Sequence, residues 1–335
     1  MVRTFSLLYF VGFLTLITAD DFPSTPFKVV NDTIQIPLDV GIPKQHLTFT
    51  LDTTSADLQM NHCSDHTLYN QSNPKNCYIH DASMKYGQVA PPMRAYDMVS
   101  WTSYTNSFIQ VFPIYDQYVN LQVMETGIMG VGFSNLSILN GVFTPFMQNL
   151  LDNSNPYYQI SISENGVDGM LATGKFLGQK YCNNPQIEYT KVTVPNFWQL
   201  RVVGYAFGED RRDISEQGII NSTSPVVTMP RRYLWPITKK HGIEYDAKAE
   251  SYVVECGKKD LPDFEVNMDN AKVILGPQHY VDPTPLANGK CKVLLADSKH
   301  QGFTPAWALG MPVFKAYCVL FDYKHLQVGF TTSAW

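Results

Sequence analysis

Two short stretches decide the fold of this chain: Phe49-Thr-Leu-Asp52-Thr-Thr-Ser55 and Gly218-Ile-Ile-Asn221-Ser-Thr-Ser224. Each begins with an apolar run typical of a strand, reaches a carboxylic acid or its amide, and continues into hydroxyl residues. A glycine-containing segment follows each of them, Gly127-Ile-Met-Gly130-Val-Gly132 after the first and Trp307-Ala-Leu-Gly310 after the second. This repeated order predicts two similar halves.

Most of the remaining chain also has the pattern of strands. Short runs rich in Val, Ile, Phe, Tyr and Thr alternate with Pro, Gly and Asn, which is typical of β-strands and their turns. These runs span residues 33–40, 46–51, 108–114, 159–163, 191–194 and 199–203. Only Pro145–Leu151 and Arg231–Lys239 suit short helices. The sequence therefore predicts a mostly β protein.

The composition bounds the size and the class of the protein. The chain has 335 residues, of which 44% are hydrophobic and 16% are charged, so it can bury more than one core. Its net charge is −5, and no basic patch calls for a nucleic-acid partner. We expect a compact, ordered protein.

Residues 1–19 have the layout of a secretory signal peptide. Arg3 precedes an apolar run over residues 7–18, and the small residue Ala19 follows it. A membrane anchor is the rival interpretation, but the run is shorter than the roughly 20 apolar residues that span a bilayer. We therefore expect cleavage after Ala19, no membrane span afterwards, and a secreted or extracellular protein or one in an endomembrane lumen, with the lysosome left open.

An oxidising compartment of this kind favours disulfides and permits glycosylation of sequons. The six cysteines are an even number in an oxidising compartment, which favours three disulfides, and fifteen pairings are possible by counting alone. Four sequons begin at Asn31, Asn70, Asn135 and Asn221. We expect glycans on the first three, in exposed loops.

A zinc site is the alternative for four of the residues between the first two sequence motifs. Cys63-x-x-His66 and Cys77-x-x-His80 have spacings that zinc sites use. Secretion favours a disulfide over thiolate ligands. We therefore expect neither a metal nor a cofactor.

The motifs, taken in their common order, resemble the pepsin-like aspartic peptidases, the family known as peptidase A1. The resemblance runs from about Thr33 to the C-terminus. It also covers Lys85-Tyr-Gly, Phe197-Trp-Gln, Phe321-Asp and Val328-Gly-Phe330. It implies a bilobal pepsin-like acid protease fold, in which two β-barrel-like lobes surround a central cleft. The N-terminal β lobe with its flap would span residues 20–182, and the C-terminal lobe with the closing strands residues 183–335.

The resemblance also implies roles for single residues. Asp52 matches the first catalytic aspartate, whereas Asn221 stands where the family has the second. Tyr86 matches the tyrosine of the flap. The resemblance pairs the cysteines as Cys63 with Cys77, Cys182 with Cys318 and Cys256 with Cys291.

The neighbours of the two dyad positions combine kept and altered features. Thr53 and Ser222 match the hydroxyls that brace the two loops in the family. Thr54 and Thr223 replace glycines, and a β-branched residue fills space that glycine leaves open. The scaffold of the site is thus expected to persist while its chemistry changes.

The substitution at residue 221 predicts the loss of catalysis. An Asn amide neither accepts nor releases a proton at accessible pH, so it cannot alternate between acid and base with Asp52. General acid–base catalysis contributes roughly 10²- to 10⁴-fold per step. We expect the side chains of Asp52 and Asn221 to lie about one hydrogen bond apart, roughly 2.6 to 3.2 Å between heavy atoms, without a shared proton.

The leading hypothesis is therefore a monomeric, secreted pseudoprotease that binds a peptide or a protein in its cleft. Residual aspartic endopeptidase activity is the first alternative, because Asn221-Ser is a dipeptide prone to deamidation, which would create an aspartate. An extracellular inhibitor or binding module on the same fold is the second. Taken singly, Asp52, Asn221 and Tyr86 also suit ordinary turns and hairpins.

Overall fold

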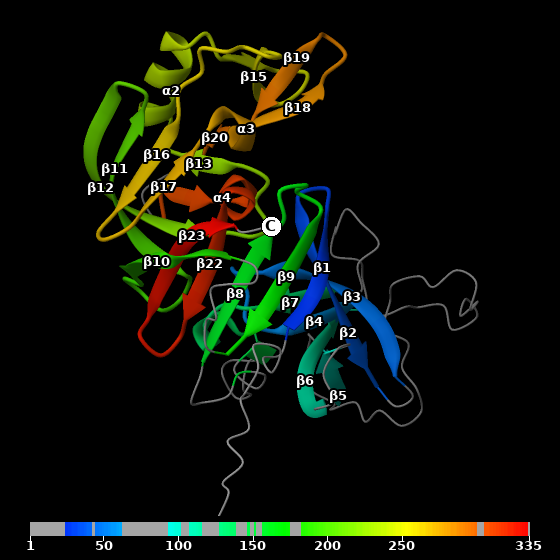
Figure 1. Cartoon of the computed structure of the whole chain (residues 1–335). Helices are drawn as coiled ribbons and strands as arrows, with labels where there is room; N and C mark the ends of the chain where they lie inside the picture. Colours follow the sequence, from blue (N-terminus) through cyan, green and yellow to red (C-terminus); the bar gives the residue numbers. More distant parts are fainter. Residues whose placement is uncertain are drawn as a thin grey trace, which may run out of the picture.

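The computed structural model describes residues 24–41, 44–61, 93–101, 107–115, 127–138, 146–147, 151, 156–174, 182–299 and 305–333. In these ranges the strands form sheets of twelve, seven and four strands, so the chain is mostly β, as predicted (Figure 1). Among the described residues, no helix is long and apolar enough to cross a membrane.

The largest sheet combines strands from both ends of the chain. Its order is β10-β23-β22-β8-β9-β1-β2-β3-β7-β4-β6-β5. The strands are β1 (Ser24–Val30), β2 (Thr33–Val40), β3 (Gln45–Asp52), β4 (Leu58–Asn61), β5 (Met93–Trp101), β6 (Ser107–Tyr115), β7 (Gly127–Gly130), β8 (Tyr157–Ile162), β9 (Asp168–Thr173), β10 (Cys182–Lys191), β22 (Tyr317–Asp322) and β23 (Gln327–Ser333). Because β22 pairs with β8, this sheet crosses the expected lobe boundary at residue 182.

The second half of the chain builds the two smaller sheets. The seven-stranded sheet holds β11 (Gln199–Phe207), β12 (Asp210–Ile220), β13 (Val227–Met229), β16 (Phe264–Met268), β17 (Lys272–Leu275), β20 (Leu295–Asp297) and β21 (Trp307–Leu309). The four-stranded sheet holds β14 (Glu244–Asp246), β15 (Ser251–Glu255), β18 (Val281–Pro285) and β19 (Lys290–Val293). The helical elements are η1 (Ser134–Leu136), α2 (Arg231–Lys240), α3 (Pro277–Tyr280) and α4 (Met311–Ala316).

Alternation along the strands explains how the core forms. In β2 the side chains of Ile34, Ile36 and Leu38 are fully buried, while the residues between them are partly exposed. Successive side chains of a strand point to opposite faces, so a period of two places one apolar row in the core.

One three-stranded arrangement occurs in each half. β7 pairs in parallel with β3 and antiparallel with β4. β21 pairs in parallel with β12 and antiparallel with β13. The two motifs that decide the fold therefore end equivalent strands, which explains the repeated order seen in the sequence.

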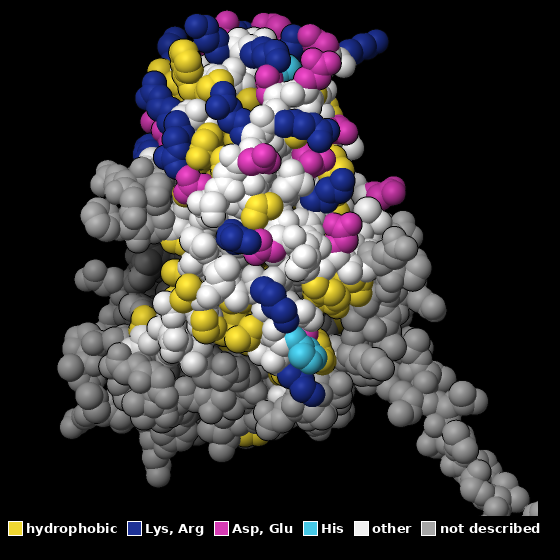
Figure 2. All heavy atoms as spheres, turned by 90° about the vertical axis from the view of Figure 1, so that its left-hand side faces the viewer, with side chains coloured by type: hydrophobic (Ala, Val, Ile, Leu, Met, Phe, Trp, Pro, Cys, Tyr) yellow, Lys and Arg dark blue, Asp and Glu magenta, His cyan; other side chains and the backbone are white. Residues whose placement is uncertain are grey.

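The surface of the second half is rich in charge. Figure 2 shows Lys and Arg side chains interspersed with Asp and Glu over the end of the molecule that carries α2. Hydrophobic side chains lie among them.

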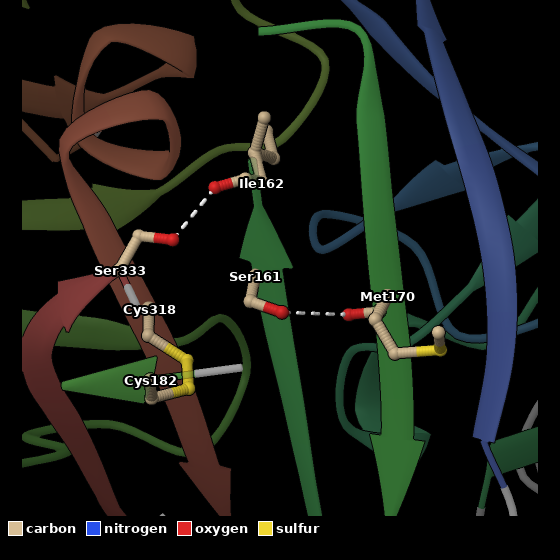
Figure 3. The surroundings of a disulfide bond; sticks show 6 residues. All are labelled: Ser161, Ile162, Met170, Cys182, Cys318 and Ser333. Carbon is tan, nitrogen blue, oxygen red and sulfur yellow. Dashed lines mark hydrogen bonds between the residues drawn. A yellow bond between two sulfur atoms is a disulfide. The ribbon is translucent and has the colours of Figure 1, made fainter. Parts of the chain in front are cut away.

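Two of the three expected disulfides lie in the described ranges, and both are formed. Cys182 of β10 bonds to Cys318 of β22 with the Cα atoms 5.7 Å apart (Figure 3). Cys256 bonds to Cys291 with a Cα separation of 5.0 Å. The third pair, Cys63 with Cys77, lies outside the described residues, as do His66 and His80 of the alternative zinc site.

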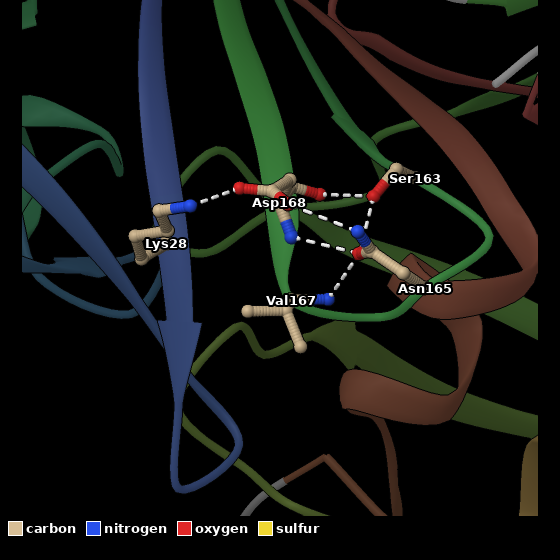
Figure 4. Close-up of polar contacts among 5 residues, drawn as sticks. All are labelled: Lys28, Ser163, Asn165, Val167 and Asp168. Carbon is tan, nitrogen blue, oxygen red and sulfur yellow. Dashed lines mark hydrogen bonds and ion pairs between the residues drawn. The ribbon is translucent and has the colours of Figure 1, made fainter.

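The β8–β9 turn is held by its own polar residues. The Asn165 side-chain oxygen accepts hydrogen bonds from the backbone N–H groups of Val167 and Asp168, at 2.8 and 3.0 Å. The Asp168 carboxylate in turn pairs with Lys28 of β1 (Figure 4). This local network links the β8–β9 turn to β1.

Candidate functional site

Asp52 is the last residue of β3, where the strand meets β7. It lies opposite Gly130 in the parallel pairing, and its carbonyl accepts a hydrogen bond of 2.9 Å from the Val131 N–H. Its side chain belongs to the buried set, with 8% of the residue exposed. The strand pair thus places one carboxylate at the end of the first three-stranded arrangement.

Asn221 occupies the equivalent place in the second arrangement. It directly follows β12, and its N–H donates to the carbonyl of Leu309 in β21 at 3.0 Å. The residue is partly exposed. The internal repeat seen in the sequence is therefore present in the backbone hydrogen bonds.

Thr53 and Ser222, both fully buried, join the two loops through a reciprocal set of hydrogen bonds. The Thr53 N–H donates to the Ser222 Oγ at 3.1 Å, and the Ser222 N–H donates to the Thr53 Oγ1 at 3.0 Å. Each hydroxyl then donates at 2.8 Å across the pair, Thr53 to the carbonyl of Ile220 and Ser222 to that of Leu51. Four buried bonds thus hold together residues that are 169 positions apart in the sequence.

The threonines that follow bind the two dyad positions in the same way. Thr54 donates to the Asp52 Oδ1 from its N–H at 2.7 Å and from its hydroxyl at 2.6 Å. Thr223 donates to the Asn221 Oδ1 from its N–H at 3.0 Å and from its hydroxyl at 2.8 Å. Because the Asn221 oxygen accepts both bonds, its Nδ2 remains a donor. The sequence predicted only that these threonines would fill space; their hydrogen bonds were missed.

The sequence predicted that the side chains of Asp52 and Asn221 lie about one hydrogen bond apart, and this separation remains a prediction. In the part of the chain that the structure describes, no hydrogen bond joins the two side chains, and each Oδ1 accepts from its own threonine instead. The loops are brought together by Thr53 and Ser222 and not by the dyad positions.

The carbonyl of Val131, next to the strand end that holds Asp52, accepts three side-chain donors. They are the indole N–H of Trp198 at 2.9 Å and the hydroxyls of Tyr158 at 3.0 Å and Tyr323 at 2.7 Å. Burial raises the pKa of both tyrosines, so their hydroxyls stay protonated donors. Trp198 lies in the motif Phe197-Trp-Gln named in the sequence analysis, whereas neither tyrosine was predicted to belong to the site.

The buried carboxylate of Asp57 links the segment that follows the first motif to the end of η1. Asp57 accepts hydrogen bonds of 2.7 Å from the Ser137 hydroxyl and from the Ile138 N–H, just beyond η1. A buried carboxylate needs such donors. Sequence reasoning missed this role, although Asp57 follows the first motif by only a few residues.

Some predicted site residues lie elsewhere or are outside the described ranges. Asn31 is exposed at the β1–β2 turn, and Asn135 is exposed in η1. Asn70 and the flap residue Tyr86 lie outside the described residues, so the predictions made for them remain predictions.

Chemically, the site offers one carboxylate at Asp52 and one amide at Asn221. Within the described ranges, no group of three His, Cys, Asp or Glu side chains is placed to hold a metal ion. A single carboxylate and an amide can bind polar groups, but they provide one ionisable proton carrier and not two.

Comparison with known sequences decides the family. A sequence profile described as "Eukaryotic aspartyl protease" matches residues 34–333, which is most of the chain. This chain belongs to the eukaryotic aspartyl protease family. Its relatives in the family include pepsin B of Canis lupus familiaris, which is 24% identical over 329 residues, covering 89% of this chain and 80% of that protein.

Other aspartyl proteases extend the comparison. Aspartic protease 1 of Caenorhabditis elegans is 26% identical over 216 residues, covering 62% of this chain and 54% of that protein. This match therefore spans little more than half of the length of that relative. The crystal structure of the aspartic proteinase from Irpex lacteus superposes with a TM-score of 0.75 at 14% identity, over 93% of this chain and 97% of that one. It confirms the pepsin-like fold.

Proposed function

We propose that this family member is a proteolytically inactive homologue that binds a peptide or protein ligand at the site of Asp52 and Asn221. The observation that carries the proposal is the pair of matched hydrogen-bond sets, in which Thr54 binds a carboxylate and Thr223 binds an amide. The loop scaffold has the symmetry of a two-acid site, whereas only one side chain can exchange a proton.

The threonines strengthen this proposal. Each threonine places its hydroxyl and its N–H on one oxygen of the preceding dyad position, with donor–acceptor distances of 2.6 to 3.0 Å. Aspartic protease chemistry needs two carboxyl groups that share a proton and alternate their roles. Restoring aspartate at residue 221 alone would leave both threonines in place.

The test is cleavage of a fluorogenic peptide pool at pH 3 to 5 by the full chain. We expect no turnover by the wild type that depends on Asp52, and retained binding of peptides from the pool. The triple variant Asn221→Asp, Thr54→Gly, Thr223→Gly should gain turnover, because general acid–base help is worth roughly 10²- to 10⁴-fold.

The controls are Asp52→Ala in both backgrounds and mass spectrometry of the peptide containing Asn221. The mass spectrum establishes that the tested protein still carries the amide, because deamidation would supply the second acid. Wild-type cleavage that Asp52→Ala abolishes, in protein that retains the amide, would show that the protein is a working protease.

We extend the proposal to the cellular setting. Two formed disulfides suit an oxidising compartment, which supports the secreted or endomembrane assignment. The exposed Asn31 and Asn135 suit glycans, whereas Asn221 lies beside the fully buried Ser222 and should carry none. Glycopeptide mapping distinguishes these sites.

A further inference from the structure

A second concave site lies in the half of the chain built from residues 183–333. It is a cavity of about 890 Å³ between α2, the β14–β15 hairpin and β20. Figure 1 shows α2, β15 and β20 in the upper half of the molecule. Small-molecule sites commonly fall between about 300 and 1,000 Å³. The residues that line this cavity include neither Asp52 nor Asn221.

Aromatic side chains form one part of its wall. Trp235 of α2 is 52% exposed and Tyr245 of β14 is 60% exposed, which is high for rings of this size. The Tyr245 ring meets the ring of Tyr252 edge to face, with centroids 5.4 Å apart. The Lys239 ammonium lies 4.9 Å from the centroid of the Trp235 ring. These rings offer apolar faces next to polar edges.

Cations without a carboxylate partner form another part. The cavity is lined by three cations that make no ion pair within the described residues, Arg231, Lys239 and Lys299. Among the described lining carboxylates, Glu250 alone neither pairs with a cation nor accepts a hydrogen bond from an N–H group. Glu244 is already paired with Lys290 at 2.7 Å, which is not part of the lining.

The remaining acid is also engaged. Asp297 accepts a hydrogen bond of 2.9 Å from the Lys299 N–H. That N–H is neutral, so Asp297 keeps its charge, and Arg231, Lys239 and Lys299 face the carboxylates of Glu250 and Asp297 without an ion pair. The lining therefore has an excess of one positive charge, together with carboxylate oxygens that can accept hydrogen bonds from hydroxyl groups.

This combination matches a particular ligand chemistry. A sugar ring has an apolar C–H face that packs on an aromatic ring and a rim of hydroxyls that need both donors and acceptors. A carboxylate on the sugar would satisfy the unpaired cations. A peptide strand is less suited, because the neighbouring edge strand β14 has only three residues to pair with it.

We propose that this cavity binds a short acidic oligosaccharide, with sugar rings packed on Trp235 and Tyr245 and separate sugar carboxylates paired with Arg231, Lys239 and Lys299. The site is separate from the Asp52 and Asn221 loops and does not depend on the function proposed for them.

The test is an isothermal calorimetric titration of the full chain with a hexasaccharide of galacturonic acid, at low and at physiological salt concentration. We expect saturable binding that weakens with salt. Trp235→Ala should weaken it about tenfold or more, because the exposed ring supplies the packing surface. Lys239→Gln should weaken it and reduce its salt dependence.

The matched controls are Lys272→Gln and Ile274→Ala on β17, which change an exposed cation and an exposed apolar side chain outside the cavity. Both should bind like the wild type, and all variants should melt at the same temperature. Uncharged cellohexaose should bind more weakly than the acidic sugar, and hexaglutamate should not compete with it.

Three outcomes would overturn the proposal. They are the absence of saturable binding to the acidic hexasaccharide, equal binding by the Trp235→Ala variant, and hexaglutamate binding as tight as that of the sugar. The last result would identify a site for acidic peptides.

Discussion

At the residue scale, the central feature is the exchange of hydrogen bonds between Thr53 and Ser222. Each hydroxyl accepts a hydrogen bond from a backbone N–H of the other loop and donates one to a backbone carbonyl of the strand that leads into that loop. Two hydroxyls thus satisfy four buried backbone groups. A buried donor or acceptor that loses its partner keeps the full cost of its lost hydration. These hydroxyls are therefore structural residues whether or not the site has chemistry.

Ser222→Ala should destabilise the fold strongly. It removes the acceptor of the Thr53 N–H and the donor to the Leu51 carbonyl, and each orphaned buried group costs about 1 to 3 kcal/mol. Urea unfolding measures the change. The control is Thr193→Ala, which removes an exposed hydroxyl that donates a hydrogen bond to the Gln217 side chain. It should change the free energy of unfolding by less than about 0.5 kcal/mol. Equal effects of the two variants would contradict the structural role of Ser222.

At the element scale, the repeated three-stranded arrangement depends on close approach of backbone segments at glycines, of which Gly130 and Gly310 are the equivalent pair in the two halves. A Cβ on Gly130 would lie 2.6 Å from the backbone of Ala56 and Asp57, and a Cβ on Gly310 would lie 2.2 Å from the Val226 carbonyl oxygen. The loop that follows each motif strand therefore passes directly against a glycine at the end of the partner strand, Gly130 in β7 or Gly310 just after β21. This packing explains why the glycine-containing segments accompany the motifs.

Gly310→Ala should be more harmful than an equally crowded substitution elsewhere. Its new methyl group would meet two fixed carbonyl oxygens, and overpacking of this kind costs about 1 to 3 kcal/mol. Gly276→Ala is the matched control, because its Cβ would meet only the end of the flexible Gln278 side chain, at 2.4 Å. Thermal melting compares the two, and a Gly276 variant as unstable as the Gly310 variant would contradict the argument.

Several elements could be predicted from the sequence because their hydrophobic pattern is strong. Residues 33–40 form β2 as predicted, and the helix expected over 231–239 is α2 with one further residue. The strand expected over 191–194 is wrong, since β10 ends at Lys191. Only the end of β12, Gly218-Ile-Ile, was predicted as a strand, because its beginning, Asp-Arg-Arg-Asp, is charged and mostly exposed, so that pairing with β11 and not burial makes it a strand.

The site was predictable only in part for a similar reason. The motifs identified Asp52, Asn221 and the bracing hydroxyls, because local sequence carries them. The convergence of Tyr158, Trp198 and Tyr323 on one carbonyl depends on three strands or loops that are distant in sequence. Single-sequence periodicity contains no information on such long-range contacts.

At the scale of the whole molecule, the two bridges in the described ranges close loops of very different length. Cys182 and Cys318 are 136 residues apart, whereas Cys256 and Cys291 are 35 residues apart. The longer bridge links β10 to β22 within the sheet that combines both ends of the chain. It therefore restricts a much larger part of the unfolded chain.

Removing the longer bridge, Cys182–Cys318, should lower the free energy of unfolding by more than removing the shorter one. In the chain-entropy treatment, the difference between the two loops is about 1 kcal/mol. The double variants Cys182→Ala/Cys318→Ala and Cys256→Ala/Cys291→Ala test this, each measured by urea unfolding against the oxidised wild type. A larger loss for the shorter bridge would show that contacts at the cysteines outweigh the loop entropy.

The pairing of β22 with β8 also determines the order in which the protein can fold during synthesis. The edge of β8 has been made by residue 162, but its neighbour β22 begins only at Tyr317. At about 5 to 20 residues per second, the ribosome needs roughly 8 to 30 seconds to supply the missing strand. For that interval, the nascent chain carries an unpaired sheet edge of apolar sequence, the kind of surface that holding chaperones recognise and that aggregates when left uncovered.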